Sequence, residues 1–205
     1  MYTSIVATSQ SLRGMLNANF NADARPFGLA SHFSGGNLEV SLATPREMRG
    51  RQQGLSVWLY RVARDDMRLN DPPVQRPLAG GGIELLPPPL PLRLHYLMTP
   101  LVDNAPEIEQ QILGRVLQLF NTVPVISGAD LSGDLAGSDA RIHIRLEALS
   151  LEETSRVWEA LDGSFQLSVS YEVTLANIEN RSQPVRRQLV ESVHTAYSLV
   201  VGEPS

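Results

Sequence analysis

The amino-acid sequence lacks two of the twenty residue types entirely. Its 205 residues include no cysteine and no lysine, so all 17 basic residues are arginines. The absence of cysteine excludes disulfides, thiol nucleophiles, zinc–cysteine sites and iron–sulfur ligation. The absence of lysine excludes a Schiff-base nucleophile and the lysine of a phosphate-binding loop. Codon bias in a GC-rich genome explains the exclusive use of arginine, and the planar guanidinium also suits contacts between subunits.

Long apolar runs are missing as well. No stretch approaches the ~20 apolar residues of a transmembrane helix. The first residues, MYTSIVATSQSLRGML, lack the basic start and apolar core of a signal peptide. We therefore expect no direct membrane insertion. The expected location is the cytoplasm, although a protein without cysteine also tolerates release from the cell.

The charge is unevenly distributed along the chain. The net charge of −5 divides into +3 for residues 1–102, which hold 10 arginines and 7 acidic residues, and −8 for residues 103–205, which hold 7 arginines and 15 acidic residues. No dense basic patch with interleaved aromatic residues occurs, so we expect no nucleic-acid partner. The separation of charge is compatible with subunits that meet positive face to negative face.

Hydrophobic periodicity and loop composition predict the elements of the fold. Helical spacing predicts helices over residues 4–20, 106–120 and 151–161. Alternation predicts strands over residues 38–42, 55–63, 90–100, 141–149, 167–178 and 187–201, with a short extended piece near residues 123–127. Glycine and proline make residues 64–89 the longest predicted irregular segment, and composition predicts a flexible loop over residues 127–139.

This order of elements predicts an α/β (α+β) fold, with a mixed, mainly antiparallel sheet and two or three helices packed on one of its faces. Asn104 with Glu107, and Ser150 with Glu153, have the spacing of N-terminal capping boxes for two of the helices. The length fits a single domain over residues 1–185, followed by a C-terminal strand or arm over residues 186–205.

Two histidines are the candidate catalytic or metal-binding residues. His95 and His143 each lie on the polar side of an alternating strand, and would share a cleft if the two strands were neighbours. A zinc site needs three or four ligands at fixed spacing, and a serine hydrolase needs a nucleophile on a turn such as GxSxG; neither pattern occurs. Cross-strand polar contacts explain both histidines more simply. A hydrolase using His95 or His143 is the enzymatic alternative, and we expect no cofactor and no small-molecule substrate.

The series of short motifs in the chain resembles a known family. In chain order these are VWLYR at 57–61, LRLHYL at 92–97, Leu113-Gly114, LEALSLEETSRVW at 146–158 and SVSYEV at 168–173. Each motif is weak alone. Their combination, over roughly residues 55–180, resembles the cap or tail-terminator proteins of phage-tail-like contractile injection systems.

The resemblance implies a non-enzymatic structural protein. Such caps form a homohexameric ring at the distal end of a tube and sheath, where they stop polymer growth. The implied partners are therefore further copies of the chain and the sheath and tube proteins of the particle. The particle would assemble in the cytoplasm and either stay there or be released. Another scaffold or binding module of a phage-like particle is the alternative within this class.

Two segments are the predicted interfaces. Arg46, Arg49 and Arg51 lie in a connection of mobile composition and could contact acidic residues of an adjacent subunit. The run from residue 187 to residue 201 could add as a strand to a sheath subunit or a neighbouring copy, or form an ordinary edge strand of its own domain. Its predicted apolar contacts are Leu189, Val193, Tyr197 and Leu199.

Overall fold

The computed structural model divides the chain into two compact units. It describes residues 2–23, 28–33, 38–68, 70–78, 82–86, 88–178 and 185–187. The first unit comprises residues 1–70 and 89–179, and the second comprises residues 71–88 and 180–205. The predicted domain boundary at residue 185 stays a prediction. Among the described helices, none combines the length and the apolar character needed to cross a bilayer.

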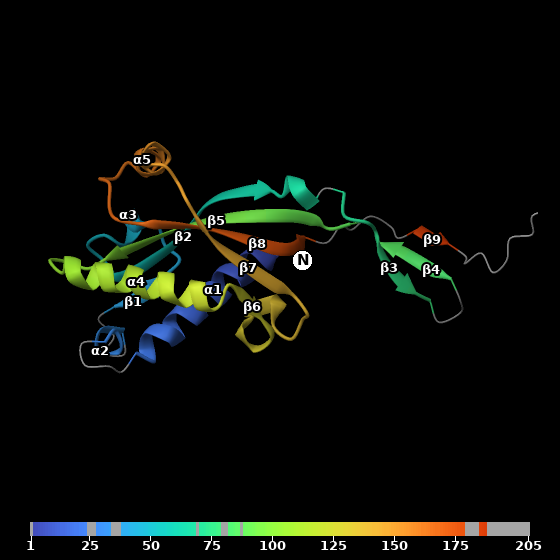
Figure 1. Cartoon of the computed structure of the whole chain (residues 1–205), viewed down its shortest axis with the longest axis horizontal. Coiled ribbons are helices and arrows are strands. Elements are labelled where there is room, and N and C mark those ends of the chain that lie inside the picture. The colour runs from blue at the N-terminus through green and yellow to red at the C-terminus, as the bar shows by residue number, and fades with distance from the viewer. Residues whose placement is uncertain are drawn as a thin grey trace, which may run out of the picture. The chain divides into compact units, whose positions relative to one another are not determined.

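A six-stranded sheet forms the centre of the first unit (Figure 1). In spatial order its strands are β1 (Glu39–Ser41), β2 (Gly54–Arg64), β5 (Leu90–Leu101), β8 (Val169–Ile178), β7 (Arg141–Glu147) and β6 (Val125–Ser127). Only β1 and β2 pair in parallel, and the other neighbours are antiparallel. The predicted mixed, mainly antiparallel sheet is therefore confirmed.

The main core lies between one face of this sheet and two long helices, α1 (Ser4–Asn21) and α4 (Pro106–Thr122). A short helix, α2 (Ala30–Phe33), adds Phe33, whose ring centroid lies 4.6 Å from that of Phe20. Alternation along β5 directs Leu94, Tyr96 and Met98 into this core, and all three are fully buried. The buried Tyr96 hydroxyl bonds Ser9 Oγ at 2.8 Å, which satisfies its polar group.

The opposite face of the sheet also carries a helix, so the prediction of helices on one face is wrong. Helix α5 (Leu151–Ala160) packs Trp158 and the following Leu161 against Leu97 of β5. Leu97 lies on the strand face that also holds Arg93 and His95, and it is only 1% exposed. The sequence gives little indication that this face is covered by a helix. Leu97 is a single apolar residue among polar ones, and such a pattern is typical of a strand face exposed to solvent.

The second unit corrects the prediction of an irregular segment over residues 64–89. Strands β3 (Val74–Pro77) and β4 (Ile83–Leu86) pair antiparallel, and β4 also pairs with β9 (Val185–Arg187). A short 3₁₀ turn, η1 (Asp66–Arg68), precedes them. Proline is tolerated on edge strands such as β3, and β9 comes from about 100 residues away. Local composition therefore could not reveal this sheet.

Helix caps give one confirmed and one wrong prediction. Ser150 caps α5: its Oγ accepts from the Glu153 amide, and Glu153 Oε2 accepts from the Ser150 amide at 2.9 Å. Asn104 does not cap α4, because it adopts a left-handed conformation with φ of 54° and the N-cap is Ala105. Glu109 acts at this end instead, accepting from the Val102 amide at 3.0 Å.

The predicted flexible loop over residues 127–139 is folded onto α1. It contains two 3₁₀ turns, η2 (Gly128–Asp130) and η3 (Gly133–Leu135), and its two leucines, Leu131 and Leu135, are buried in the main core. The Ser132 amide donates to Ser11 Oγ of α1 at 2.9 Å. Burial of these two leucines, four residues apart, therefore stabilises the segment in a folded conformation despite its glycine-rich composition.

Candidate functional site

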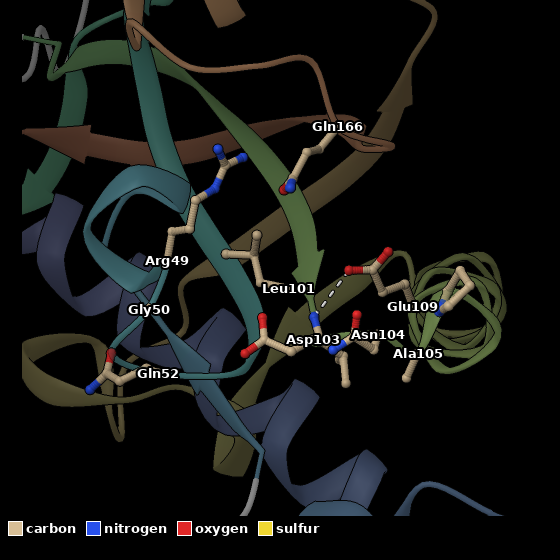
Figure 2. Close-up of a pocket in the computed structure, with 11 residues that line it drawn as sticks. Arg49, Gly50, Gln52, Leu101, Asp103, Asn104, Ala105, Glu109 and Gln166 are labelled. Atoms are coloured by element: carbon tan, nitrogen blue, oxygen red, sulfur yellow. Dashed lines mark hydrogen bonds between the residues drawn. The ribbon is translucent and has the colours of Figure 1, made fainter.

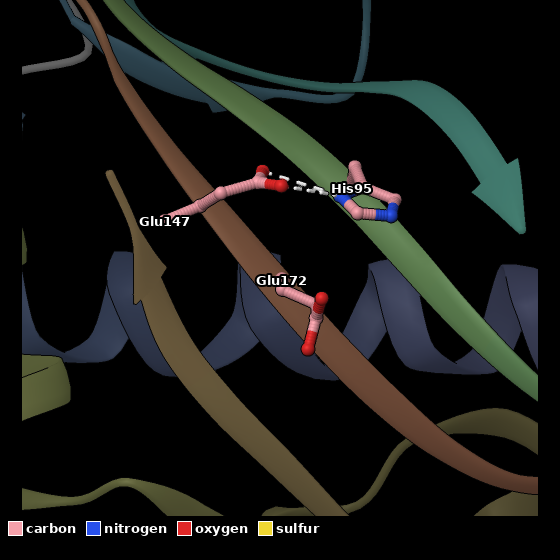
Figure 3. A group of neighbouring side chains, drawn as sticks. All are labelled: His95, Glu147 and Glu172. Atoms are coloured by element: carbon pink, nitrogen blue, oxygen red, sulfur yellow. Dashed lines mark hydrogen bonds and ion pairs between the residues drawn. The ribbon is translucent and has the colours of Figure 1, made fainter. Parts of the chain in front are cut away.

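The first candidate site is a hydrogen-bonded network around His95 on the α5 face of the sheet (Figure 3). His95 is 4% exposed, and its Nδ1 lies 3.0 Å from Glu147 Oε1. Glu147 also accepts from Ser170 Oγ at 2.7 Å and from the Tyr60 hydroxyl at 3.2 Å. Four strands thus contribute to one cluster, in which Glu147 is the shared acceptor.

Glu172 extends this network between two arginines. It lies on β8, in register with His95 on one side and Arg145 on the other. Arg145 Nη2 is 2.9 Å from Glu172 Oε1, and Arg93 Nη1 is 3.5 Å from Glu172 Oε2. Glu147 therefore contacts an imidazole, and Glu172 contacts two guanidinium groups.

A metal ion fits this network poorly. His95, Glu147 and Glu172 each offer one ligand atom, and these atoms lie within 4.8 Å of one another. However, Glu172 already bonds two arginines, whose positive charges would repel a dication. The side-chain set instead has the character of an ion network, in which both carboxylates, Glu147 and Glu172, have partners.

The order of bonds also differs from that of a hydrolytic triad. In a triad the imidazole bonds the nucleophilic hydroxyl and the carboxylate orients the imidazole. Here Ser170 Oγ donates to Glu147 directly, and Ser170 is 4% exposed near the start of β8. The structure therefore gives the hydrolase alternative no support at His95.

His143 lies apart from His95. Strand β8 separates β7 from β5, so the two histidines are not on neighbouring strands. His143 is exposed and in register with Thr174, whereas His95 is in register with Glu172. The condition under which the pair could share a cleft is not met.

The pKa of Glu147 links this network to stability. Burial acts to raise the pKa of its carboxyl group, but hydrogen bonds from Ser170, His95 and Tyr60 together hold it below the ordinary value of 4.5. The ionised carboxylate is thus favoured by folding. Its contribution to stability is present above the pKa of the unfolded chain and is lost as the pH falls through the pKa of the folded chain.

We expect the difference in unfolding free energy between the wild type and Glu147→Gln to shrink as the pH is lowered from about 7 to about 4. Urea denaturation at a series of pH values measures it. Glu152→Gln is the matched control, because Glu152 is an exposed residue of α5 that bonds only Arg156 among the hydrogen bonds described. A difference for Glu147→Gln that stays constant over this range would contradict the role of the ionised carboxylate.

The second candidate site contains the predicted interface arginines. Arg46, Arg49 and Arg51 lie on and just after helix α3 (Pro45–Met48), and all three are exposed. The segment differs from the predicted mobile connection. Thr44 and Glu47 form a capping box, and the side chain of Met48 is fully buried. The T-x-x-E spacing at 44–47 was a signal in the sequence that could have identified this helix.

The arginines have different surroundings. Arg46 Nη1 lies 3.3 Å from Asp162 Oδ2 and 3.5 Å from the Leu161 carbonyl oxygen, which ties α3 to the end of α5. Arg49 lines a hollow of about 400 Å³. Figure 2 shows Arg49 and Gln166 approaching this hollow from one side, with Asp103 and Glu109 near the end of β5. Its lining mixes apolar and polar residues and carries both signs of charge, which suits contact with another protein surface. The other predicted interface residues, Leu189, Val193, Tyr197 and Leu199, lie outside the described residues.

Comparison with solved structures places the fold among tube terminators. The chain is similar to the sheath/tube terminator of an extracellular contractile injection system, PVC, in its extended state, with a TM-score of 0.62 and 17% identity over 98% of this chain and 65% of that one. It is also similar to the tube-terminating cap of the anti-feeding prophage, with a TM-score of 0.60 and 20% identity over 94% of this chain and 61% of that one. The chain therefore spans less than two thirds of the length of either structure.

The chain thus has an α+β fold similar to that of tube terminators. The chain belongs to the family of the Pvc16 N-terminal domain, whose sequence profile matches residues 7–192. The resemblance to contractile injection system caps is therefore confirmed at the level of family and fold. No curated protein matches the chain in sequence.

Proposed function

We propose that this protein is a structural cap that terminates the distal end of the tube and sheath of a contractile, phage-tail-like particle. The observation that carries the proposal is the likeness of nearly the whole chain to two terminators of such particles, together with its membership of the Pvc16 N-terminal domain family. The cap acts as a homohexameric ring and catalyses no reaction. Its partners are further copies of itself and the sheath and tube proteins. It assembles in the cytoplasm, in a particle that is then retained or released.

The geometry of the first unit supports a structural role. On the α5 face of its sheet, Glu147 bonds His95 and Ser170, and Glu172 pairs with Arg93 and Arg145, so that polar groups link neighbouring strands. Such a network fixes the arrangement of neighbouring strands and contributes specificity to the fold. A rigid sheet of this kind is a suitable support for contacts that must repeat identically around a ring.

Electron microscopy of particles assembled with and without this chain tests the proposed function. With the chain, particles should have a narrow distribution of lengths and a closed distal end. Without it, the tube and sheath should vary in length or lack that end. Particles of normal, defined length in the absence of the chain would contradict a terminating role. Sedimentation of the purified chain tests the ring separately, because a hexamer has six times the mass of a monomer.

We further propose that the arginines at α3 contact an acidic surface of the adjacent subunit. The double charge reversal Arg49→Glu/Arg51→Glu should raise the concentration required for half-maximal assembly by about tenfold at low salt, and by less at high salt, because exposed charges are screened. Arg46 is retained because it bonds Asp162 within the subunit. Assembly is followed by sedimentation velocity.

The control for this reversal is Arg13→Glu/Arg141→Glu, which makes the same change in net charge at two exposed arginines elsewhere. It should leave assembly nearly unchanged. Equal effects of the two double variants would mean that overall charge, rather than this surface, governs assembly.

We also propose that residues 186–205 are an arm that, beyond β9 (Val185–Arg187), contacts another subunit through Leu189, Val193, Tyr197 and Leu199. The run is apolar and rich in residues that favour strands, and unpaired strand edges are ready partners for such a segment. A chain ending at residue 187, which keeps β9, should lose assembly or sheath binding, as measured by sedimentation and co-pelleting with sheath. A ring that forms and binds sheath without these residues would contradict the arm.

A further inference from the structure

Strand β2 has an open edge in its second half. On its outer side β1 pairs only with residues 54–56, whereas on its inner side β5 pairs along β2 as far as Arg64. Among the described residues, no strand therefore lies beside Trp58–Arg64 on the outer side. Figure 1 shows this part of β2 at the border of the sheet.

The backbone of this edge has hydrogen-bonding groups to offer. The Glu39 amide donates to the Gln53 carbonyl at 2.9 Å, so alternate residues from Gln53 onward turn their backbone groups toward the outer side. This alternation places the amide and carbonyl of Leu59 there. A register shift between Leu59 and Arg61 marks a bulge, after which pairing with β5 continues to Arg64. Within the described part of the chain, no turn or loop backbone supplies a partner for these groups.

The side chains along the edge indicate what kind of strand it would accept. Val62 is 49% exposed although Leu94, its register partner on β5, is fully buried. A strand beside β2 would cover Val62. Arg61 and Arg64 are exposed, and residues 57–64 contain no acidic residue. Arg64 pairs with Asp66 at 3.1 Å just after the strand. Like charges on adjacent strands are unfavourable, so two copies of β2 would repel each other and an acidic segment would be preferred.

We propose that this edge receives residues 188–201 of a second copy of the chain as an added strand. Those residues contain no glycine and no proline, and they include four valines, one threonine and one tyrosine, residue types that favour strands. Residues 188–201 hold one acidic residue, Glu191, and no arginine, which complements Arg61 of the edge. The inference rests on the proposed ring, because a tail added to the next copy is a head-to-tail contact that repeats around a closed assembly.

Cysteine cross-linking tests the pairing directly, since the chain has no cysteine of its own. Ala63→Cys on β2 is combined with one cysteine at each position from 190 to 200 in turn. Mild oxidation of the full chain should give covalent dimers and larger oligomers on a denaturing gel. Side chains alternate along a strand, so the yield should be high at every second position. Leu117→Cys on α4, which packs on the main-core face of the sheet, replaces Ala63→Cys as the control and should give no such pattern.

Each alternative outcome is distinct. Cross-linked monomers would place the segment in its own subunit and overturn the proposal. A hexamer by sedimentation without any cross-link to Ala63→Cys would also overturn it, while leaving the proposed function intact. A monomer without cross-links would contradict the ring itself. Cross-links from Ala63→Cys to the sheath protein, in assembled particles, would assign the edge to a different occupant.

Discussion

Replacing Trp158 with alanine is expected to lower the unfolding free energy by about 3–5 kcal/mol. Trp158 is 3% exposed and packs with Leu97 and Leu161 in the small cluster that joins α5 to the sheet. Removing the indole leaves a cavity beneath a helix of only ten residues, which has no other fully buried anchor among its described residues. Urea denaturation followed by circular dichroism measures the loss.

Leu151→Ala provides the matched control for this variant. Leu151 lies on the same helix but is 73% exposed, so its removal should change the unfolding free energy by no more than about 0.5 kcal/mol. The two variants thus compare the loss of a buried side chain with the loss of an exposed side chain on the same helix. Similar costs for both would mean that α5 is held to the sheet by something other than the Trp158 cluster.

Loss of α5 packing should also disturb the position of the interface arginines at α3. Arg46 bonds Asp162 and the Leu161 carbonyl, directly after α5. If Trp158→Ala releases this end of the helix, the position of α3 loses one of its contacts. Assembly of Trp158→Ala under conditions where the variant is still folded should therefore be weaker than that of Leu151→Ala.

The two histidines should respond very differently to removal. His95→Ala is expected to cost about 2–3 kcal/mol, because it leaves a cavity and deprives the partly buried Glu147 of one of its bonds. His143→Ala, at an exposed site, should cost no more than about 0.5 kcal/mol. Chemical denaturation of both variants provides the comparison.

This pair also separates a structural role from a catalytic one. A structural His95 predicts that stability and ring formation decline together, and that suppressing the instability restores assembly. A catalytic His95 would instead leave the fold and the oligomer intact while abolishing turnover of a substrate. Full assembly and unchanged stability of His95→Ala would contradict the structural interpretation of the network.

Local sequence patterns were sufficient for the main elements of the first unit. Alternation along Leu90–Leu101 and Arg141–Glu147 identified β5 and β7, and helical spacing identified α1 and α4. The Ser150 capping box marked the start of α5. These signals are local because strand and helix periodicity and capping depend only on residues within a few positions of each other. The ordered motifs also led to the correct family.

The sequence did not reveal which strands are neighbours in the sheet. The candidate site depends on this order of strands. Alternation placed His95 and His143 on polar faces, but the order of strands inserted β8 between them and brought Glu147 and Glu172 to His95 instead. Neighbouring strands are chosen by packing across the whole sheet, and their register follows from that packing. A single chain's periodicity carries no information about it.

The sequence by itself therefore determined the elements, the family and the absence of thiol and amine chemistry. Only the tertiary structure decided that a polar strand face would be covered by α5, that β4 would pair with both β3 and β9, and that the second half of β2 would keep an open edge. The physical reason is the range of the interactions. Periodicity and capping act within one element, whereas burial of a face and pairing of an edge depend on segments far apart in the chain.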